Sequence, residues 1–206
     1  MSDDAIHVFG QWAERGRAEP MGRSHAPRAM AALEKLPVQS GQRVLDLGCG
    51  EGWAARELAA RVAPDGEAVG VDGSEAMLSR ARFTPRPCLS YVHGRLLALP
   101  FADGTFDHAF SMEALYYVPL DEALAEVARV LRSGGWLAAC TDFYEEHAAC
   151  HAWPEELGLS MDLRSTSGWV DAVRGAGFDQ VRSQRLPDPG KPDHPGTLAI
   201  FANKKA

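Results

Sequence analysis

The run VLDLGCGEGW, residues 44–53, places an apolar segment directly before three closely spaced glycines, Gly48, Gly50 and Gly52. A short apolar segment bounded by turn residues is typical of a buried parallel strand. Glycines allow the backbone to turn tightly and to approach a ligand without a Cβ in the way. The helix predicted after them would offer unpaired N–H groups to that ligand. The run therefore predicts a strand, a ligand-binding turn and a helix.

Strands and helices alternate through the rest of the chain. We predict strands at 68–71, 89–93, 106–111 and 136–141, and helices at 75–82, 120–131 and 167–175. This alternation predicts a parallel sheet with helices on both faces. The last two strands, near 179–186 and 197–202, are joined by a Pro/Gly-rich loop without a helix, which predicts an antiparallel pair at one edge. The fold class is therefore α/β, a Rossmann-like doubly wound sheet that is mostly parallel with an antiparallel last strand.

The amino-terminal region is expected to form two helices, at 5–17 and 27–36. Pro20, Gly22 and Pro27 separate them and oppose a continuous helix. We expect residues 1–206 to form a single domain in which residues 1–36 act as a helical lid, with candidate lid residues Trp12, Arg17, Met21 and His25. Residues 142–153 are also expected to be helical until Pro154 and Gly158 break the helix.

Composition excludes several classes of function. The net charge of −7 and the pI near 5.5 oppose binding of a nucleic-acid backbone. The four cysteines show no CxxC pair, which favours reduced thiols in the cytoplasm. Neither a secretion signal nor an eighteen-residue apolar run is evident, so no membrane insertion is expected. These features predict a cytoplasmic monomer or homodimer that acts on a small molecule.

Two acidic residues indicate which cofactor the glycine turn binds. The spacing G-x-G-x-G differs from the dinucleotide pattern G-x-G-x-x-G, and Asp46 lies just before it. A carboxylate there opposes a pyrophosphate and suits a cofactor with an amino group and a positive sulfonium. Asp72 ends the second strand, where Rossmann-like folds place an acid that accepts both ribose hydroxyls. The alternative is that the glycines only make a tight connection and that Asp72 forms a turn.

Four blocks together resemble the class I S-adenosylmethionine-dependent methyltransferases, especially the small-molecule branch with the ubiquinone and menaquinone C-methyltransferases. They are VLDLGCGEGW (44–53), VGVDGSEAMLSRAR (69–82), ALPFADGTFDHAFSMEALYYVP (98–119) and EVARVLRSGGWLAA (126–139). The resemblance implies a seven-stranded sheet, S-adenosyl-L-methionine as cofactor and methyl transfer to a small molecule by in-line displacement. The expected cofactor-binding residues are Asp46, Gly48, Cys49, Gly50, Asp72, Gly73, Met77, Arg95, Leu96, Ser111 and Met112.

Arg95 departs from the pattern of this family. Its members usually have an acid in the sequence G-D-A-x-x-L-P-F that accepts a hydrogen bond from the adenine amino group, whereas this chain has HGRLLALPF at 93–101. An arginine cannot accept that bond. Either the backbone near Arg95 and Leu96 holds the adenine, or the guanidinium stacks on it or pairs with an acid such as Asp72 or Glu113, or the cofactor binds more weakly.

The candidate catalytic residues are Tyr116, Tyr117 and His147. The tyrosines follow the fourth strand, and their rings could hold a substrate ring or the sulfonium by cation–π attraction, or could simply pack in the core. His147 and His151 would share one face of the expected helix beside Glu146. Because this pair has no evident third ligand, no metal site is predicted.

Two other functions are compatible with the sequence. One is a nicotinamide-dependent oxidoreductase, which the glycine spacing and Asp46 oppose. The other is a non-catalytic S-adenosylmethionine-binding regulatory module, which Arg95 favours.

Overall fold

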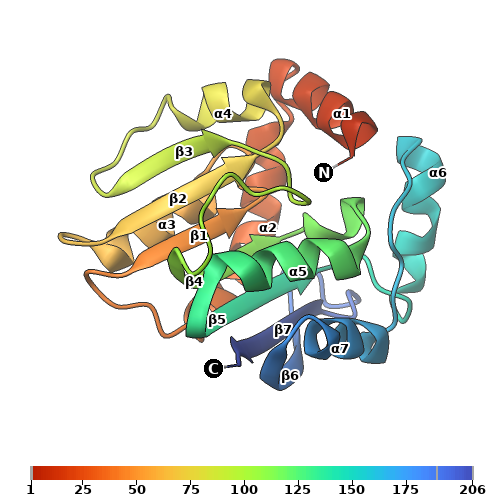
Figure 1. Cartoon of the computed structure of the whole chain (residues 1–206). Helices are drawn as coiled ribbons and strands as arrows, with labels where there is room; N and C mark the ends of the chain where they lie inside the picture. Colours follow the sequence, from red (N-terminus) through yellow and green to blue (C-terminus); the bar gives the residue numbers. More distant parts are fainter. Residues whose placement is uncertain (1, 189, 206) are drawn as a thin grey trace.

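The computed structural model describes residues 2–188 and 190–205, and within them one seven-stranded sheet has the order β3-β2-β1-β4-β5-β7-β6. The strands are β1 (Arg43–Leu47), β2 (Glu67–Asp72), β3 (Leu89–His93), β4 (Phe106–Met112), β5 (Leu131–Thr141), β6 (Phe178–Leu186) and β7 (Thr197–Lys204). The first five pair in parallel, and β7 runs antiparallel to both β5 and β6. The predicted fold class is confirmed (Figure 1).

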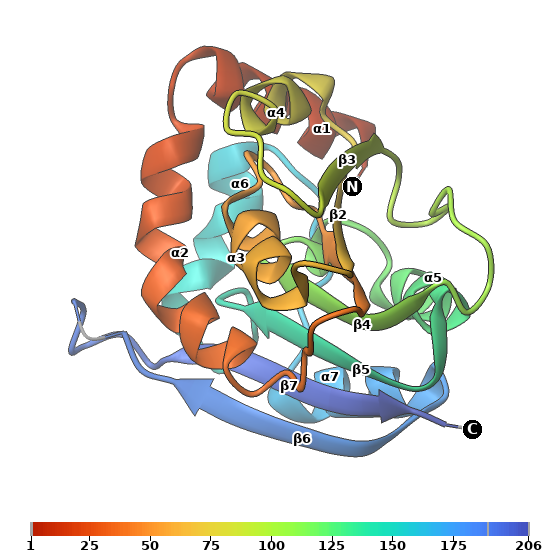
Figure 2. The same ribbon diagram turned by 90° about the vertical axis from the view of Figure 1, so that its left-hand side faces the viewer.

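Helices cover both faces of the sheet. They are α1 (Asp3–Glu14), α2 (Ala18–Leu33), α3 (Trp53–Val62), α4 (Glu75–Ala81), α5 (Leu120–Val130), α6 (Trp153–Leu157) and α7 (Thr166–Gly175). Figures 1 and 2 show α2 and α3 on one face and α5 and α7 on the other, while α1 and α6 lie beyond the carboxyl ends of the parallel strands. These two outer helices are therefore placed to close a site at that edge.

The interior strand β1 separates two packed layers. Leu45 and Leu47 belong to the core layer that contains Leu124 of α5, whereas Val44 belongs to the layer that contains Leu58 of α3. Successive side chains of a strand point to opposite faces, so this alternation buries β1 on both sides. The apolar run at 44–47 therefore forms a buried interior strand, as predicted from its short apolar sequence between turns.

The topology opens a crevice at the end of β1. Leu47 pairs with Val71 of β2 on one side and with Ser111 of β4 on the other. The chain therefore leaves β1 at the point where the strand order reverses, which is where open α/β sheets bind ligands. The loops after β1, β2 and β4 meet there.

The amino-terminal helices differ from the prediction, because α2 continues through Pro20 and Pro27. Pro20 lies in the first turn, where backbone N–H groups have no helical partner to lose. Pro27 lies inside the helix and removes one hydrogen bond. The helix continues because tertiary contacts hold it: Ala32 and Leu33 are fully buried, as is the charged side chain of Arg28. The predicted break was wrong.

The predicted helix at 142–153 was also wrong. A 3-10 turn, η2 (Ala148–Ala152), precedes the short helix α6, and Pro154 lies in the first turn of α6 rather than ending a longer helix. Proline fits the first turn because its missing N–H would have no partner there. His147 precedes η2 and is buried, whereas His151 lies within η2 and is exposed. The two side chains therefore do not share a helical face. Gly158 ends α6 as expected, with φ at 64°.

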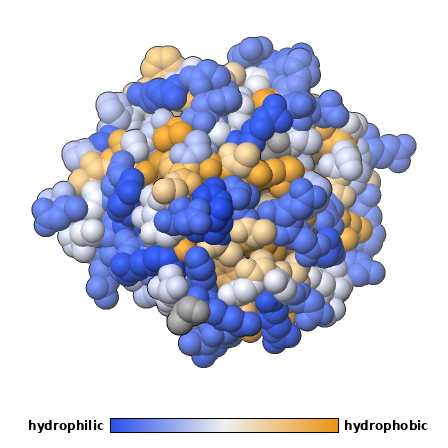
Figure 3. All heavy atoms as spheres, in the orientation of Figure 1, coloured by the Kyte–Doolittle hydropathy of each residue, from blue (hydrophilic) through white to orange (hydrophobic). Residues whose placement is uncertain are grey.

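A few large apolar side chains are exposed on the surface. Figure 3 shows apolar atoms interrupted by polar side chains on the face of Figure 1. In the described ranges the large exposed apolar residues are Phe83, Leu97 and Leu163. Among the helices of residues 2–188 and 190–205, none has the length and apolar character required to cross a bilayer.

Candidate active site

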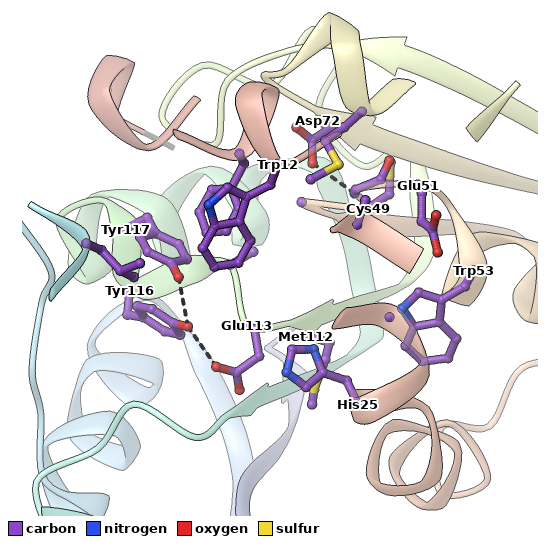
Figure 4. A pocket seen from close by; sticks show the side chains of 18 of the residues that line it. Trp12, His25, Cys49, Glu51, Trp53, Asp72, Met112, Glu113, Tyr116 and Tyr117 are labelled. Carbon is purple, nitrogen blue, oxygen red and sulfur yellow. Dashed lines mark hydrogen bonds between the residues drawn. The ribbon is translucent and has the colours of Figure 1, made fainter. Parts of the chain in front are cut away.

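A cavity of about 320 Å³ lies at the carboxyl ends of β1, β2 and β4. This volume lies within the range of pockets that bind small molecules. The glycine turn and Asp72 form one wall, and the loop after β4 forms another; residues of α1, α2, α3, α4 and α6 complete the lining (Figure 4). Its lining residues are Phe9, Trp12, Ala18, Gly22, His25, Gly48, Cys49, Gly50, Glu51, Trp53, Asp72, Met77, Met112, Glu113, Ala114, Tyr116, Tyr117, Trp153, Glu156 and Leu157.

The glycines of the turn meet different requirements. An added Cβ on Gly48 would lie 2.3 Å from the Cβ of Ala114, and one on Gly52 would lie 2.1 Å from the hydroxyl of Tyr91. These two glycines therefore allow the turn to pack closely. Gly50 has φ of 53°, and an added Cβ would meet no other atom within 4 Å. Because Gly50 lines the cavity, it leaves open the space that a ligand would fill.

Asp72 is held rigidly at the cavity wall. Its Oδ2 accepts the backbone N–H of Gly50 at 2.9 Å, and its Oδ1 accepts that of Ser74 at 2.8 Å. Burial raises the pKa of the Asp72 carboxyl, while these two N–H groups favour its ionised form. A carboxylate has about four lone-pair positions, so both oxygens can still accept further donors. This arrangement fits a ligand that carries two neighbouring hydroxyl groups.

Asp46 lies beneath the glycine turn and does not line the cavity. Its Oδ2 is buried and has no hydrogen-bond partner among the described residues. Burial raises the pKa of Asp46 to about 7, although the amide of Ala55 favours the carboxylate. This buried oxygen of Asp46 would attract a cationic group in the cavity and repel a pyrophosphate.

Three polar side chains form a connected group on the wall opposite Asp72. The hydroxyl of Tyr116 donates to Oε2 of Glu113 at 2.7 Å and lies 3.3 Å from the hydroxyl of Tyr117. The other carboxylate oxygen of Glu113 accepts the backbone N–H of Asp142. Figure 4 shows the two hydroxyls and the carboxylate in a row. Burial, reinforced by the nearby charge of Asp142, raises the pKa of Glu113 well above its ordinary range.

The remaining walls are largely aromatic. Phe9 and Trp12 of α1 pack edge to face with ring centroids 5.2 Å apart, and Phe9 packs in the same way on Tyr117 at 5.1 Å. Trp153 of α6 also lines the cavity. Burial lowers the pKa of His25 to about 4, so its ring is uncharged at neutral pH. The part of the cavity away from Asp72 therefore suits an uncharged aromatic or apolar group.

The predicted site residues divide into two sets. The residues that line the cavity are Gly48, Cys49, Gly50, Asp72, Met77, Met112, Tyr116 and Tyr117. Those outside its wall are Asp46, Gly73, Arg95, Leu96, Ser111 and His147. Gly73 lies under Ile6, the hydroxyl of Ser111 donates to the carbonyl of Leu47, and Leu96 is in the core. Met21 was expected in the lid, but its side chain lies outside the described part of the structure.

Several lining residues were not predicted from the sequence. They are Phe9, Ala18, Gly22, Glu51, Trp53, Ala114, Trp153, Glu156 and Leu157. Glu51 and Trp53 lie within the glycine run at 44–53, so their place beside a ligand on that turn could have been predicted. The residues of α6 gave no such signal, because the sequence did not indicate where this short helix lies.

His147 lies one layer behind the cavity wall. Its Nδ1 is 2.7 Å from the carbonyl of Asp142, and its ring packs edge to face on Trp153, which does line the cavity. Within the described residues, no group of three or more His, Cys, Asp or Glu side chains is arranged to hold a metal ion. The geometry places His147 where it can position Trp153.

Arg95 pairs with an acid other than the two considered above. Its guanidinium forms an ion pair with Asp3 in the first turn of α1, and both side chains are largely exposed. Asp72 is bound by backbone amides, and Glu113 by an amide and Tyr116. Arg95 thus connects the loop after β3 to the amino-terminal helix.

Replacing Asp72 with alanine is expected to weaken S-adenosylhomocysteine binding by about 1.5–3 kcal/mol, because a charged acceptor of two hydroxyl donors is lost. Titration calorimetry measures the change. Asp65→Ala, which removes an exposed acid from the turn before β2, serves as the control and should bind normally. Unchanged affinity in Asp72→Ala would contradict the assignment of Asp72 to the ribose.

The Arg95→Asp variant is expected to bind S-adenosylhomocysteine more weakly, by at most about 1 kcal/mol, as is typical of exposed ion pairs. The new carboxylate would face Asp3 and loosen α1, which carries Phe9 and Trp12 of the cavity wall. Adding Asp3→Arg restores opposite charges and should restore the affinity. Tighter binding by Arg95→Asp alone would instead support a direct acid-to-adenine contact that this chain has lost.

The fold is that of a Rossmann-like protein, and the cavity beside Asp72 fits a cofactor that carries a vicinal diol. Residues 45–139 match the family model described as a methyltransferase domain. Methyltransferase GfsG of Streptomyces halstedii is 30% identical over 98% of this chain and 75% of its own length. The sterol 24-C-methyltransferase erg6 of Aspergillus fumigatus is 29% identical over 86% of this chain and 50% of its own length.

Solved structures agree with these relatives. A protein in complex with the Haloferax volcanii Trm112 methyltransferase activator superposes with a TM-score of 0.90 and 31% identity, over 96% of this chain and 98% of its own. The chain belongs to the class I S-adenosylmethionine-dependent methyltransferases, and S-adenosylmethionine is its cofactor. The comparisons do not single out the quinone C-methyltransferases among its relatives, and the chain spans only half of the sterol enzyme.

Proposed function

We propose that this protein transfers a methyl group from S-adenosylmethionine to a small, apolar or aromatic acceptor. The proposal depends on the two ends of a single cavity. Asp72, which can accept two hydroxyl groups, lies at one end, and aromatic side chains lie at the other. The sterol methyltransferase among the relatives is named for an apolar substrate, which supports the same acceptor class.

The cofactor would be held by the residues that line the first end of the cavity. The backbone from Gly48 to Gly50 would lie against it, Asp72 would accept the ribose hydroxyls, and Met77 and Met112 would contribute apolar contacts. When bound, S-adenosylmethionine supplies an electrophilic methyl group on a positive sulfur. The protein's task is to align the acceptor and to exclude water.

We infer that residues 1–206 act as one domain in which residues 1–36 form the lid. Trp12 and His25 line the cavity from α1 and α2. The carbonyl of Ala13 accepts a hydrogen bond from Arg80 at 2.6 Å, so the end of α1 is fastened to α4. A lid in this place would shield the reacting atoms from water.

The proposed partners are limited to the acceptor. We propose a cytoplasmic monomer or homodimer that does not bind nucleic acid; the net charge of −7 and the free thiols of Cys49, Cys88, Cys140 and Cys150 support this. One relative was solved with an activator protein. Light scattering on the purified chain tests the proposal, which an obligate complex with another protein would overturn.

Calorimetry with S-adenosylhomocysteine and with NADH tests the cofactor assignment. We expect tight binding of S-adenosylhomocysteine and no binding of NADH. The reverse result would favour the hypothesis of a nicotinamide-dependent oxidoreductase. Methyl transfer from labelled S-adenosylmethionine to a library of apolar hydroxyl, amine and carbon acceptors then separates an enzyme from a non-catalytic binding module. Binding without any transfer would support the module.

A further inference from the structure

The hydrogen bonds that connect Tyr117, Tyr116 and Glu113 on the wall opposite Asp72 have a definite direction. Tyr116 has one hydroxyl hydrogen, and its contact with Glu113 at 2.7 Å is shorter than its contact with Tyr117 at 3.3 Å; when the ionised carboxylate accepts that hydrogen, Tyr117 is the donor of the longer contact. The hydrogen bonds therefore run from Tyr117 through Tyr116 to the carboxylate. Tyr117 lines the cavity, and its oxygen keeps lone pairs that can accept a proton from a ligand.

Glu113 is held in place at the end of this chain. It has φ of 57°, a left-handed conformation that non-glycine residues rarely adopt and that is concentrated at functional sites. Its backbone N–H donates to the carbonyl of Cys140 at 3.0 Å, and one carboxylate oxygen accepts the amide of Asp142. The other oxygen is therefore aimed at Tyr116 by contacts on both sides of the residue.

We propose that Glu113, acting through Tyr116 and Tyr117, is the general base that takes the proton of a phenol bound in the cavity. This proposal rests on the proposed function. The acceptor oxygen forms a bond to the methyl carbon while the carbon–sulfur bond breaks and its electron pair stays on sulfur. The phenol proton passes to Tyr117, the proton of Tyr117 passes to Tyr116, and the proton of Tyr116 passes to Oε2 of Glu113.

The cavity walls favour a phenol over other acceptors. Phe9, Trp12 and Trp153 offer ring surfaces, and His25 is uncharged, so an aromatic body fits better than a charged one. A phenolic hydroxyl has an unperturbed pKa of about 10 and is barely ionised at neutral pH. Such an acceptor needs a base during transfer, which is what the chain from Tyr117 to Glu113 provides.

The charges around Glu113 set the direction of its pH dependence. It faces Asp142 and Cys140 of the β5 end, Arg28 of α2, Cys150 of η2 and the two tyrosines. Burial and Asp142 raise its pKa, and only the ionised carboxylate can accept a proton. Activity should therefore fall as the pH drops through this raised pKa, at a higher pH than an exposed glutamate would give. The activity of Glu113→Gln should not show this decrease as the pH falls.

Two phenols of different acidity provide the test. 4-Methylphenol stays neutral at mildly alkaline pH, whereas 4-nitrophenol is already largely ionised and needs no base. In single-turnover transfer from labelled S-adenosylmethionine, Glu113→Gln and Tyr117→Phe should lose about 100-fold on 4-methylphenol. The loss on 4-nitrophenol should be less than about tenfold. Tyr144→Phe, which removes a buried hydroxyl bonded to the carbonyl of Gly196 away from the cavity, should leave the ratio of the two rates unchanged.

A binding measurement complements the rates. Calorimetry on the S-adenosylhomocysteine complex should show that 4-methylphenol binds more tightly than toluene, and Tyr117→Phe should abolish the difference. Equal losses on both phenols, or failure of 4-methylphenol to bind and react, would overturn the proposal. Failure of the wild-type protein to bind S-adenosylhomocysteine would instead overturn the proposed function, so the two failures are distinguishable.

Discussion

Arg28→Ala is expected to lower the free energy of unfolding by about 3–5 kcal/mol, the loss typical of breaking a buried ion pair. Arg28 is only 1% exposed, and its guanidinium bonds Asp142 at 2.8 Å and also pairs with Asp188. It therefore joins α2 to the end of β5 and to the loop before β7. Removing it leaves two buried carboxylates without their cation. Denaturant unfolding measures the change.

The pH dependence of this loss identifies its cause. Although burial raises the pKa of Asp188, the amide of Gly190 and the charge of Arg28 together hold it below its ordinary value, so the stabilisation that Arg28 provides here is present at neutral pH and is lost as the pH falls through this lowered pKa. The deficit relative to wild type should therefore shrink in acid. A deficit that is equal at all pH values would indicate lost packing instead. Arg23→Ala, which removes an exposed pair with Glu19 on the same helix, should leave stability unchanged.

The sheet and the cofactor end of the cavity could be predicted because their signals are local. The apolar run at 44–47, the three glycines and Asp72 fix a strand, a turn and the end of the next strand within about thirty consecutive residues. The cap of α4 is equally local, because the hydroxyl of Ser74 accepts the N–H of Met77 at 3.3 Å. Each of these features depends on neighbours in the chain rather than on distant contacts.

The aromatic end of the cavity, which would hold the methyl acceptor, could not be predicted, because it depends on contacts between distant segments. Arg28 and Asp188 are 160 positions apart, and their pairing helps hold α2 together despite Pro27. Trp153 reaches the cavity only because η2 and α6 turn the chain back after β5. Glu113 and Tyr116 were noted in the sequence, but their hydrogen bond follows from the left-handed backbone at Glu113, which no residue pattern indicated.

Gly50→Val is expected to abolish cofactor binding, weakening S-adenosylhomocysteine by more than about 3 kcal/mol, or over a hundredfold. Gly50 has φ of 53°, and the space beside it is free of protein atoms within 4 Å and belongs to the cavity. A valine there would project into the volume that the ligand needs. It would also strain a left-handed backbone and disturb the amide that Asp72 accepts. Titration calorimetry, with thermal unfolding as the check on folding, measures both effects.

Gly41→Val separates the two effects of this substitution. Gly41 is exposed, has φ of 85° and also has open space around an added Cβ, but it lies in the turn before β1, away from the cavity. Both variants should therefore lose stability through backbone strain, whereas only Gly50→Val should lose the cofactor. If Gly50→Val folds and binds S-adenosylhomocysteine as well as Gly41→Val does, the glycine turn does not contact the cofactor and the site must be placed elsewhere in the cavity.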